Sequence, residues 1–206
     1  FERLCPIAKR YGAALVVGSI DEDKLQAQAF TRERKVAVAQ RSYQLLTEKY
    51  GIPGEDIIID PLVFPCATGD VNYIGGAVET IEGIRLVKEA LPFAKTVLGI
   101  SNISFGLPAS AREVVNSVFL YYCTKAGLDL AIVNAEKLER FASISEEERR
   151  LAEHLLFNTP PANAADESLR TAPEDWRAQT PEQKAAINQF HIAAIAEHFR
   201  KAGARV

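Results

Sequence analysis

Short apolar runs that end in polar residues recur along the chain. Each of these runs is followed closely by an acid or an amide: 13–20 by Asp21, 57–59 by Asp60, 96–100 by Asn102 and 128–133 by Asn134. Segments with the apolar spacing of amphipathic helices lie between the runs. This alternation predicts an α/β fold with a parallel sheet and right-handed helical crossovers.

Capping residues and periodicity place the helices. Six helices are predicted, and four of them cover 2–11, 31–50, 146–157 and 181–201. Another runs from about Ser110 to Lys125. The remaining one ends at Leu91 and has Asp70 as its candidate N-cap. Ser145 and Thr180 each begin a capping box. The apolar face of the last helix, which contains Ile187 and Ile195, must pack on the rest of this domain or on another one.

Composition changes at Asn158, where the chain becomes rich in Pro, Ala, Asp and Thr. We therefore expect 158–180 to be an irregular linker or a surface excursion. The acidic residues 21–23 form either a functional loop or a solvated one, and the solvated interpretation is favoured.

The polar residues at the strand ends are the candidates for function. The carboxyl ends of parallel strands meet at the edge where α/β folds bind ligands. Asp60 must be extended because Pro61 follows it, and Asn102 and Ser104 follow the run at 96–100. Asn102 has an alternative role as a cap of its own turn. A carboxylate accompanied by amides, without a nucleophile, suits the orientation of a heterocycle by hydrogen bonds.

Composition narrows the classes of function further. The net charge of −3 over 206 residues gives no basic surface for nucleic acid, and the apolar runs are too short for a membrane span. The three cysteines and three histidines are scattered without ligand spacing, so we expect no metal and a reduced, cytoplasmic setting. Motifs of dinucleotide-binding, P-loop and α/β-hydrolase enzymes are missing.

The sequence contains no Met and begins at Phe1 inside a predicted helix, which indicates a piece of a longer polypeptide.

Several ordered strings together resemble a known family. They are Ile-Asp-Pro-Leu-Val at 59–63, Thr-Gly-Asp at 68–70, Ala-Val-Glu-Thr-Ile-Glu-Gly-Ile at 77–84, Gly-Ile-Ser-Asn-Ile-Ser-Phe-Gly-Leu-Pro at 99–108, Arg-Glu-Val-Val-Asn-Ser-Val-Phe-Leu at 112–120 and Ile-Val-Asn at 132–134. The resemblance is to the pterin-binding domain of cobalamin-dependent methionine synthases. It implies a (β/α)₈ TIM barrel that binds 5-methyltetrahydrofolate as substrate. The N5-methyl group then passes to cob(I)alamin carried by another domain, in the methyltransferase reaction that makes methionine from homocysteine.

The resemblance also assigns roles to individual residues. It implies that Asp60 accepts from the pterin ring N–H and the exocyclic amine, and that Asn102 is the catalytic residue, bonding near N5. Ser104, Arg112 and Asn134 would complete the substrate-binding set, although the spacing before Arg112 is longer than in the family.

A complete barrel needs about 250 residues, whereas 1–157 resembles only the fifth to eighth strands, about four βα units. The remaining segments are the linker 158–180 and the C-terminal helix within 181–203. Expected partners are the cobalamin-binding domain and the missing N-terminal half, or a second copy through exposed barrel edges. Three alternatives stay open: a stand-alone methyltetrahydrofolate:corrinoid protein methyltransferase, a dihydropteroate synthase-like enzyme, and a half-barrel that is silent until it assembles with a partner half.

Overall fold

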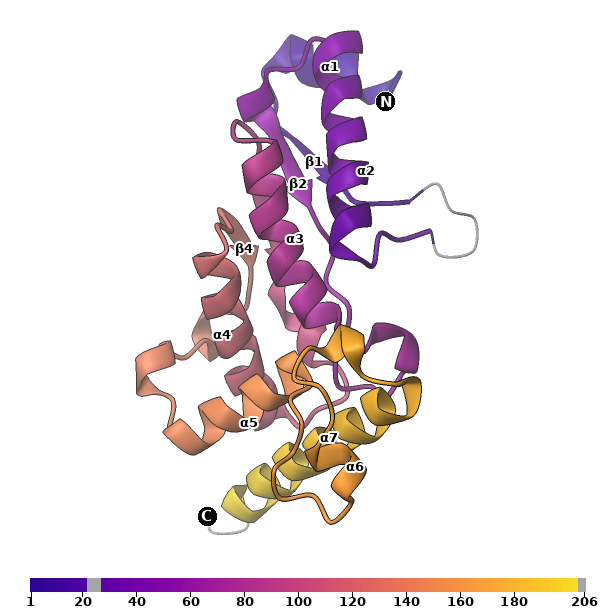
Figure 1. The fold of residues 1–206 in the computed structure, drawn as a ribbon. Coiled ribbons are helices and arrows are strands. Elements are labelled where there is room, and N and C mark those ends of the chain that lie inside the picture. The colour runs from indigo at the N-terminus through magenta and orange to yellow at the C-terminus, as the bar shows by residue number, and fades with distance from the viewer. Residues whose placement is uncertain (22–26, 204–206) are drawn as a thin grey trace. The chain divides into compact units, whose positions relative to one another are not determined.

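The computed structural model describes residues 1–21 and 27–203, so Glu22 and Asp23 of the predicted acidic loop lie outside the described residues. The chain divides into two compact units. The first contains Phe1–Leu62, Glu79–Gly99 and Cys123–Ile132, and the second contains Val63–Val78, Ile100–Tyr122 and Val133–Val206. The helices and strands in chain order are α1 Leu4–Tyr11, β1 Leu15–Gly18, α2 Arg32–Gln44, β2 Ile57–Asp60, α3 Gly76–Ala90, β3 Lys95–Gly99, α4 Ala109–Lys125, β4 Leu130–Ile132, α5 Glu146–Phe157, α6 Glu167–Arg170 and α7 Pro181–Gly203 (Figure 1).

The first unit is built on a parallel sheet in the order β1-β2-β3-β4. Each strand pairs with the next one in sequence, and helices lie in the connections between them. This sequential order is typical of a barrel and differs from the reversed order of doubly wound sheets. The predicted α/β class, as part of a TIM-type barrel, is confirmed.

One face of this sheet carries the core of the unit. Ile57 and Ile59 of β2 are completely buried, in a cluster with Ala39 of α2 and Val87 of α3. Figure 1 shows α2 and α3 running along the same side of β1 and β2. Since side chains alternate along a strand, the odd-numbered residues of β2 point to these helices and Ile58 points away from them.

The other face of the sheet is open in the described part of the chain. Val16 pairs with Ile58, and Leu130 and Ile132 pair with Val97 and Gly99. Val16, Leu130 and Ile132 are 63%, 46% and 69% exposed. In a closed barrel this face forms the packed interior.

The second unit is mainly helical. Its α5 and α7 pack on each other, and Ile187 and Ile195 of α7 are completely buried. The predicted apolar face of the last helix therefore packs within this unit. Both predicted N-caps are present. Thr180 and Gln183 exchange the two hydrogen bonds of a capping box, whereas the Ser145 hydroxyl accepts from the Glu148 backbone N–H and donates to the Glu148 carboxylate. The segment 158–180 includes the short helix α6.

Two local expectations differ from the structure. Asp70 caps the short 3₁₀ turn Val71–Tyr73 and does not cap α3, which begins at Gly76. Gly75, with φ at +81°, separates the two elements because no helix continues through a left-handed residue. The helix predicted for 31–50 begins at Arg32, after Thr31 as its N-cap, but α2 ends at Gln44 and a π-helical turn covers Leu45–Lys49.

Candidate functional site

The turn that follows β3 carries two of the predicted site residues. Residues Ile100–Ser104 form a 3₁₀ turn in which Ile100 and Ile103 are buried and anchor the backbone. Gly106 then adopts φ +99°, and a Cβ atom at this position would lie 2.4 Å from the carbonyl oxygen of Ala67. Glycine is therefore required for the loop that begins at Val63 to approach this turn closely.

The side chain of Asn102 bridges these two segments. Its Nδ2 donates a hydrogen bond to the carbonyl oxygen of Val63, and its Oδ1 accepts none within the part of the chain that the structure describes. The backbone N–H of Cys66 also donates to the carbonyl oxygen of Ile103, at 3.0 Å. The alternative role of the Asn102 side chain as a cap of its own turn is not what the structure shows.

Ser104 and Arg112 form a second link across the same turn. The Nε of Arg112 donates to the Ser104 hydroxyl at 3.0 Å, and its Nη2 donates to the Ser101 carbonyl oxygen at 3.0 Å. The guanidinium also lies 4.8 Å from the centroid of the Phe105 ring. Ser104 is completely buried, so its hydroxyl supports Arg112 and is not presented to solvent.

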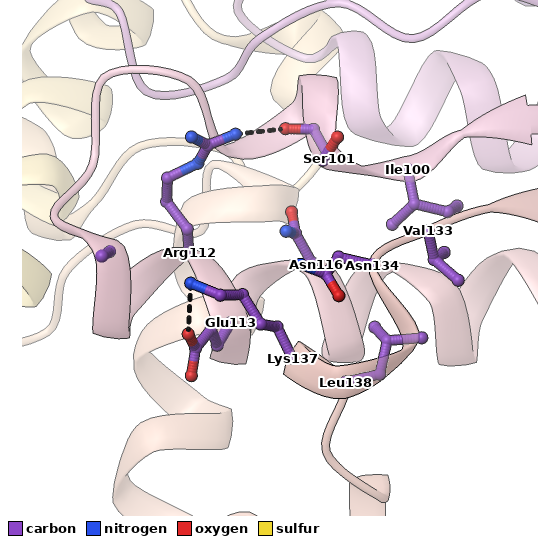
Figure 2. Close-up of a pocket in the computed structure, with 10 residues that line it drawn as sticks. Ile100, Ser101, Arg112, Glu113, Asn116, Val133, Asn134, Lys137 and Leu138 are labelled. Carbon is purple, nitrogen blue, oxygen red and sulfur yellow. Dashed lines mark hydrogen bonds and ion pairs between the residues drawn. The ribbon is translucent and has the colours of Figure 1, made fainter.

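A cavity of about 230 Å³ lies beside α4 (Figure 2). Its wall includes Ser101, Arg112, Glu113, Asn116, Asn134 and Lys137. Figure 2 shows the hydrogen bond from Arg112 to Ser101 and the ion pair between Lys137 and Glu113, which are 3.4 Å apart. The structure thus brings Arg112 of α4 and Asn134, which follows β4, to the wall of one pocket.

Two features of this pocket bear on its chemistry. Asn134 uses its Oδ1 to accept from the backbone N–H of Glu136 at 3.2 Å, so it caps the turn that follows it. Asn116 Oδ1 is buried without a hydrogen-bond partner among residues 1–21 and 27–203, which leaves an acceptor for a ligand or water. Sequence reasoning missed Asn116, although an amide between the apolar positions 114, 115 and 118 of α4 was the available signal.

Asp60 belongs to the first unit, whereas Asn102, Ser104, Arg112 and Asn134 belong to the second. It is the last residue of β2, extended as the following proline requires, and its Oδ1 accepts from the Leu62 backbone N–H at 2.9 Å. Burial raises the pKa of the Asp60 carboxyl, while the Leu62 N–H and the positive charge of Lys35 act in the opposite direction.

Lys35 is the second residue that sequence reasoning missed. It lies on α2, is completely buried, and its Nζ donates to the carbonyl oxygens of Pro61 at 2.6 Å and Leu62 at 3.2 Å. Burial lowers the pKa of Lys35 to about 7, against the charges of Glu79 and Asp60. The available signal was a cation one turn from the buried positions Val38 and Ala39 of the same helix.

Other classes of site are less well supported. In the described part of the chain, no group of three or more His, Cys, Asp or Glu is arranged to hold a metal ion. Cys5, Cys66 and Cys123 are buried free thiols, and burial raises the pKa of Cys66 to about 12. No helix within the described residues has the length and apolar character needed to cross a membrane.

A parallel sheet of successive βα units in sequential order is the arrangement found in barrel enzymes, which bind their ligands at the carboxyl ends of the strands. A family model described as pterin binding enzyme matches residues 1–134. The chain belongs to the family of pterin-binding enzymes.

Two relatives with curated names agree with this assignment. Over 158 residues, which are 77% of this chain, the chain is 44% identical to methionine synthase of Mycobacterium leprae (strain TN). Over the same length it is 42% identical to methionine synthase of Mycobacterium tuberculosis (strain ATCC 25618 / H37Rv). The chain spans only 13% of the length of either relative.

Proposed function

We propose that this chain binds 5-methyltetrahydrofolate and presents its N5-methyl group for transfer to cob(I)alamin, as part of methionine synthesis from homocysteine. The observation that carries the proposal is the aspartate at the end of β2 in a chain of the pterin-binding family. The identity with two methionine synthases supports the choice of folate as the pterin and of methyl transfer as the reaction. Cobalamin would be held by another domain, and no residue of this chain is assigned to it.

Asp60 would hold the pterin ring. A carboxylate accepts two parallel hydrogen bonds, which matches the ring N–H and the exocyclic amine of a pterin. Oδ1 of Asp60 is turned to the Leu62 N–H, and Oδ2 has no hydrogen bond within the described residues. The backbone bond fixes the orientation of the carboxylate before the ligand arrives, which reduces the entropy lost on binding.

Asn102 would act on the reacting nitrogen. A methyl group on a tertiary amine is a poor electrophile, because the departing nitrogen anion is unstable unless N5 is protonated. With Nδ2 held by the Val63 carbonyl oxygen, Oδ1 of Asn102 can accept from N5–H once N5 has taken up a proton from solvent, and the unprotonated substrate cannot make this bond. An interaction that is made only with the reacting form typically contributes about 2.7–4 kcal/mol.

The remaining predicted residues have different roles in this proposal. Arg112 and Asn134 would line the substrate site from the pocket beside α4. Ser104 would position Arg112 through the hydrogen bond between them. Residues 1–157 would form the barrel portion. The linker 158–180 and the C-terminal helix within 181–203 lie beyond the residues that the family model matches, 1–134, and would not contribute to the barrel.

The proposal is tested by an equilibrium titration of the chain with 5-methyltetrahydrofolate. Saturable binding that Asp60→Asn weakens about ten- to hundredfold is the expected result, because a hydrogen bond to a charged group is lost. Asp166→Asn is the matched control: Asp166 likewise accepts a backbone N–H two residues ahead, from Ser168 at 2.8 Å, but caps α6. Equal affinity of the Asp60 and Asp166 variants would remove Asp60 from the site.

The open face of the sheet favours a second candidate, a half-barrel that becomes active only after assembly. Val16, Leu130 and Ile132 expose apolar surface on the side that a barrel closes. Further βα units of the barrel, or a second copy of this chain, would cover it. Failure of the chain to bind the folate alone, with binding restored by co-expression of the other barrel strands, would support this candidate over the first.

A further inference from the structure

Lys35 has one of the largest side chains that are completely buried in the described part of the chain. Lysine is rarely buried in this way, because removing its ammonium from water is costly unless the charge is compensated. The fold makes room for it: a Cβ atom on Gly83 of α3 would lie 2.8 Å from Lys35 Cδ. A buried charge for which a neighbouring helix leaves space indicates a specific role.

The ammonium of Lys35 is directed at the turn that follows Asp60. It donates to the two consecutive carbonyl oxygens of Pro61 and Leu62. Leu62 has φ at +67°, in the left-handed region that a branched side chain rarely adopts. The Thr80 hydroxyl also donates to the Leu62 carbonyl oxygen at 3.0 Å. Hydrogen bonds from two helices thus hold a strained backbone in one shape.

This shape determines the orientation of the Asp60 carboxylate. The Leu62 N–H donates to Asp60 Oδ1, so the carboxylate depends on the left-handed conformation at Leu62. The charged groups around Lys35 are Asp60 on β2 and Glu79 on α3. Glu79 is completely buried and accepts from both the guanidinium and the backbone N–H of Arg32, at 2.8 and 2.6 Å. The lysine is therefore one member of a buried charged network beneath the end of β2.

We propose that Lys35 is a positioning residue for pterin binding, which holds the turn Asp60–Leu62 so that the Asp60 carboxylate is oriented before the ligand arrives. This inference rests on the proposed function, because it assigns Asp60 to the pterin. Lys35 acts through the backbone carbonyl oxygens and its charge, and does not touch the ligand.

The test compares Lys35→Met with Lys88→Met as a matched control. Lys88 of α3 likewise donates to groups next to the strands, to the Ala94 carbonyl oxygen just before β3 at 3.1 Å and to Asp129 just before β4 at 2.8 Å, but it has no hydrogen bond to Asp60 or its turn. We expect Lys35→Met to weaken 5-methyltetrahydrofolate binding about tenfold or more. Lys88→Met should leave it unchanged. Thermal unfolding checks that each variant folds, and Lys35→Gln replaces Lys35→Met if the latter does not.

A double-variant cycle separates positioning from general destabilisation. If Lys35 acts through Asp60, the double variant Lys35→Met/Asp60→Asn should bind no more weakly than Asp60→Asn alone. Equal loss from Lys35→Met in both backgrounds, or unchanged affinity of the single variant, would overturn the proposal.

A second measurement does not depend on the folate. ¹³C NMR of labelled aspartate should show a higher pKa for the Asp60 carboxyl in Lys35→Met, because the positive charge that lowers it is gone. Lys88→Met should leave that pKa unchanged. The two measurements therefore test different claims. Absence of folate binding by the wild-type chain would reject the proposed function. An unchanged pKa of Asp60 in Lys35→Met would reject the role of Lys35, whether or not folate binds.

Discussion

The side-chain amide of Asn102 donates a hydrogen bond to the carbonyl oxygen of Val63, which lies 39 residues earlier in the chain. Val63 lies in the loop after β2, and Asn102 lies in the turn after β3. The bond fixes which way the amide faces and leaves Oδ1 as the atom that can accept from a ligand. An asparagine used only as a turn cap would bond to its own segment.

Replacement of Asn102 therefore gives the sharpest test of the mechanism. In methyl transfer from 5-methyltetrahydrofolate to free cob(I)alamin, we expect Asn102→Ala to lower the transfer rate by about a hundred- to a thousandfold. The dissociation constant of the folate should change less, because an unprotonated N5 has no hydrogen to donate to Oδ1. Asn163→Ala, on an exposed position of the segment 158–180, serves as the control. Transfer at the wild-type rate in Asn102→Ala would remove this residue from the mechanism.

Gly106 provides a prediction about the support of the same turn. Gly106→Ala should destabilise the chain by about 2 kcal/mol or more, since φ of +99° and a contact of 2.4 Å with the Ala67 carbonyl oxygen both oppose a Cβ atom. Gly99→Ala is the control, because nothing lies within 4 Å of its added Cβ. Urea denaturation measures both free energies of unfolding. Equal stability of the two variants would mean that the loop moves aside without cost.

The amino-acid sequence predicts the parts of this fold that depend on local chemistry. The extended Asp60 before Pro61, the end of the first helix at Tyr11 and the N-caps Ser145 and Thr180 are all as predicted, because each depends on residues within one turn. The buried face of α3, with Ile84 and Val87, follows its apolar spacing directly.

The parts that were missed depend on residues distant in sequence. On α2 the apolar spacing of Val36, Ala39 and Tyr43 indicates a buried face, but Lys35, Val38 and Ser42 are buried as well. A lysine is tolerated there only because carbonyl oxygens 26 and 27 residues later accept from its ammonium. Periodicity contains no information about such partners. For the same reason Asn102 could be placed after its strand, but its bond to Val63 could not be foreseen.

His191 gives a pH-dependent prediction. It is buried, its Nε2 donates to the Thr159 carbonyl oxygen at 2.6 Å, and burial lowers its pKa to about 4. In the unfolded chain a histidine titrates near pH 6.5, so between about pH 6.5 and 4 the unfolded state binds more protons. Stability should therefore be complete above pH 6.5 and fall by roughly 2–3 kcal/mol as the pH decreases to 4.

The contribution of His191 can be isolated by substitution. His191→Gln keeps a donor for Thr159 but cannot be protonated, so the decrease in the free energy of unfolding between pH 6.5 and 4 should become smaller by that amount. Chemical denaturation at several pH values measures the difference, and parallel curves for wild type and His191→Gln would show that another group controls acid stability.

The open face of the sheet predicts association of the isolated chain. Ile132 is 69% exposed on the face opposite α2 and α3, so covering it with a second apolar surface is favourable. We expect sedimentation equilibrium to give a mass above that of the monomer, and Ile132→Asp to restore the monomer, because a buried unpaired carboxylate is costly. The free energy of unfolding of the monomer should change by less than about 0.5 kcal/mol, as is usual at an exposed position. Leu4→Asp, at a residue of α1 that is 68% exposed, should leave the association unchanged. A monomeric wild-type chain, or an Ile132 variant that associates as strongly as wild type, would show that this face does not bind a second copy.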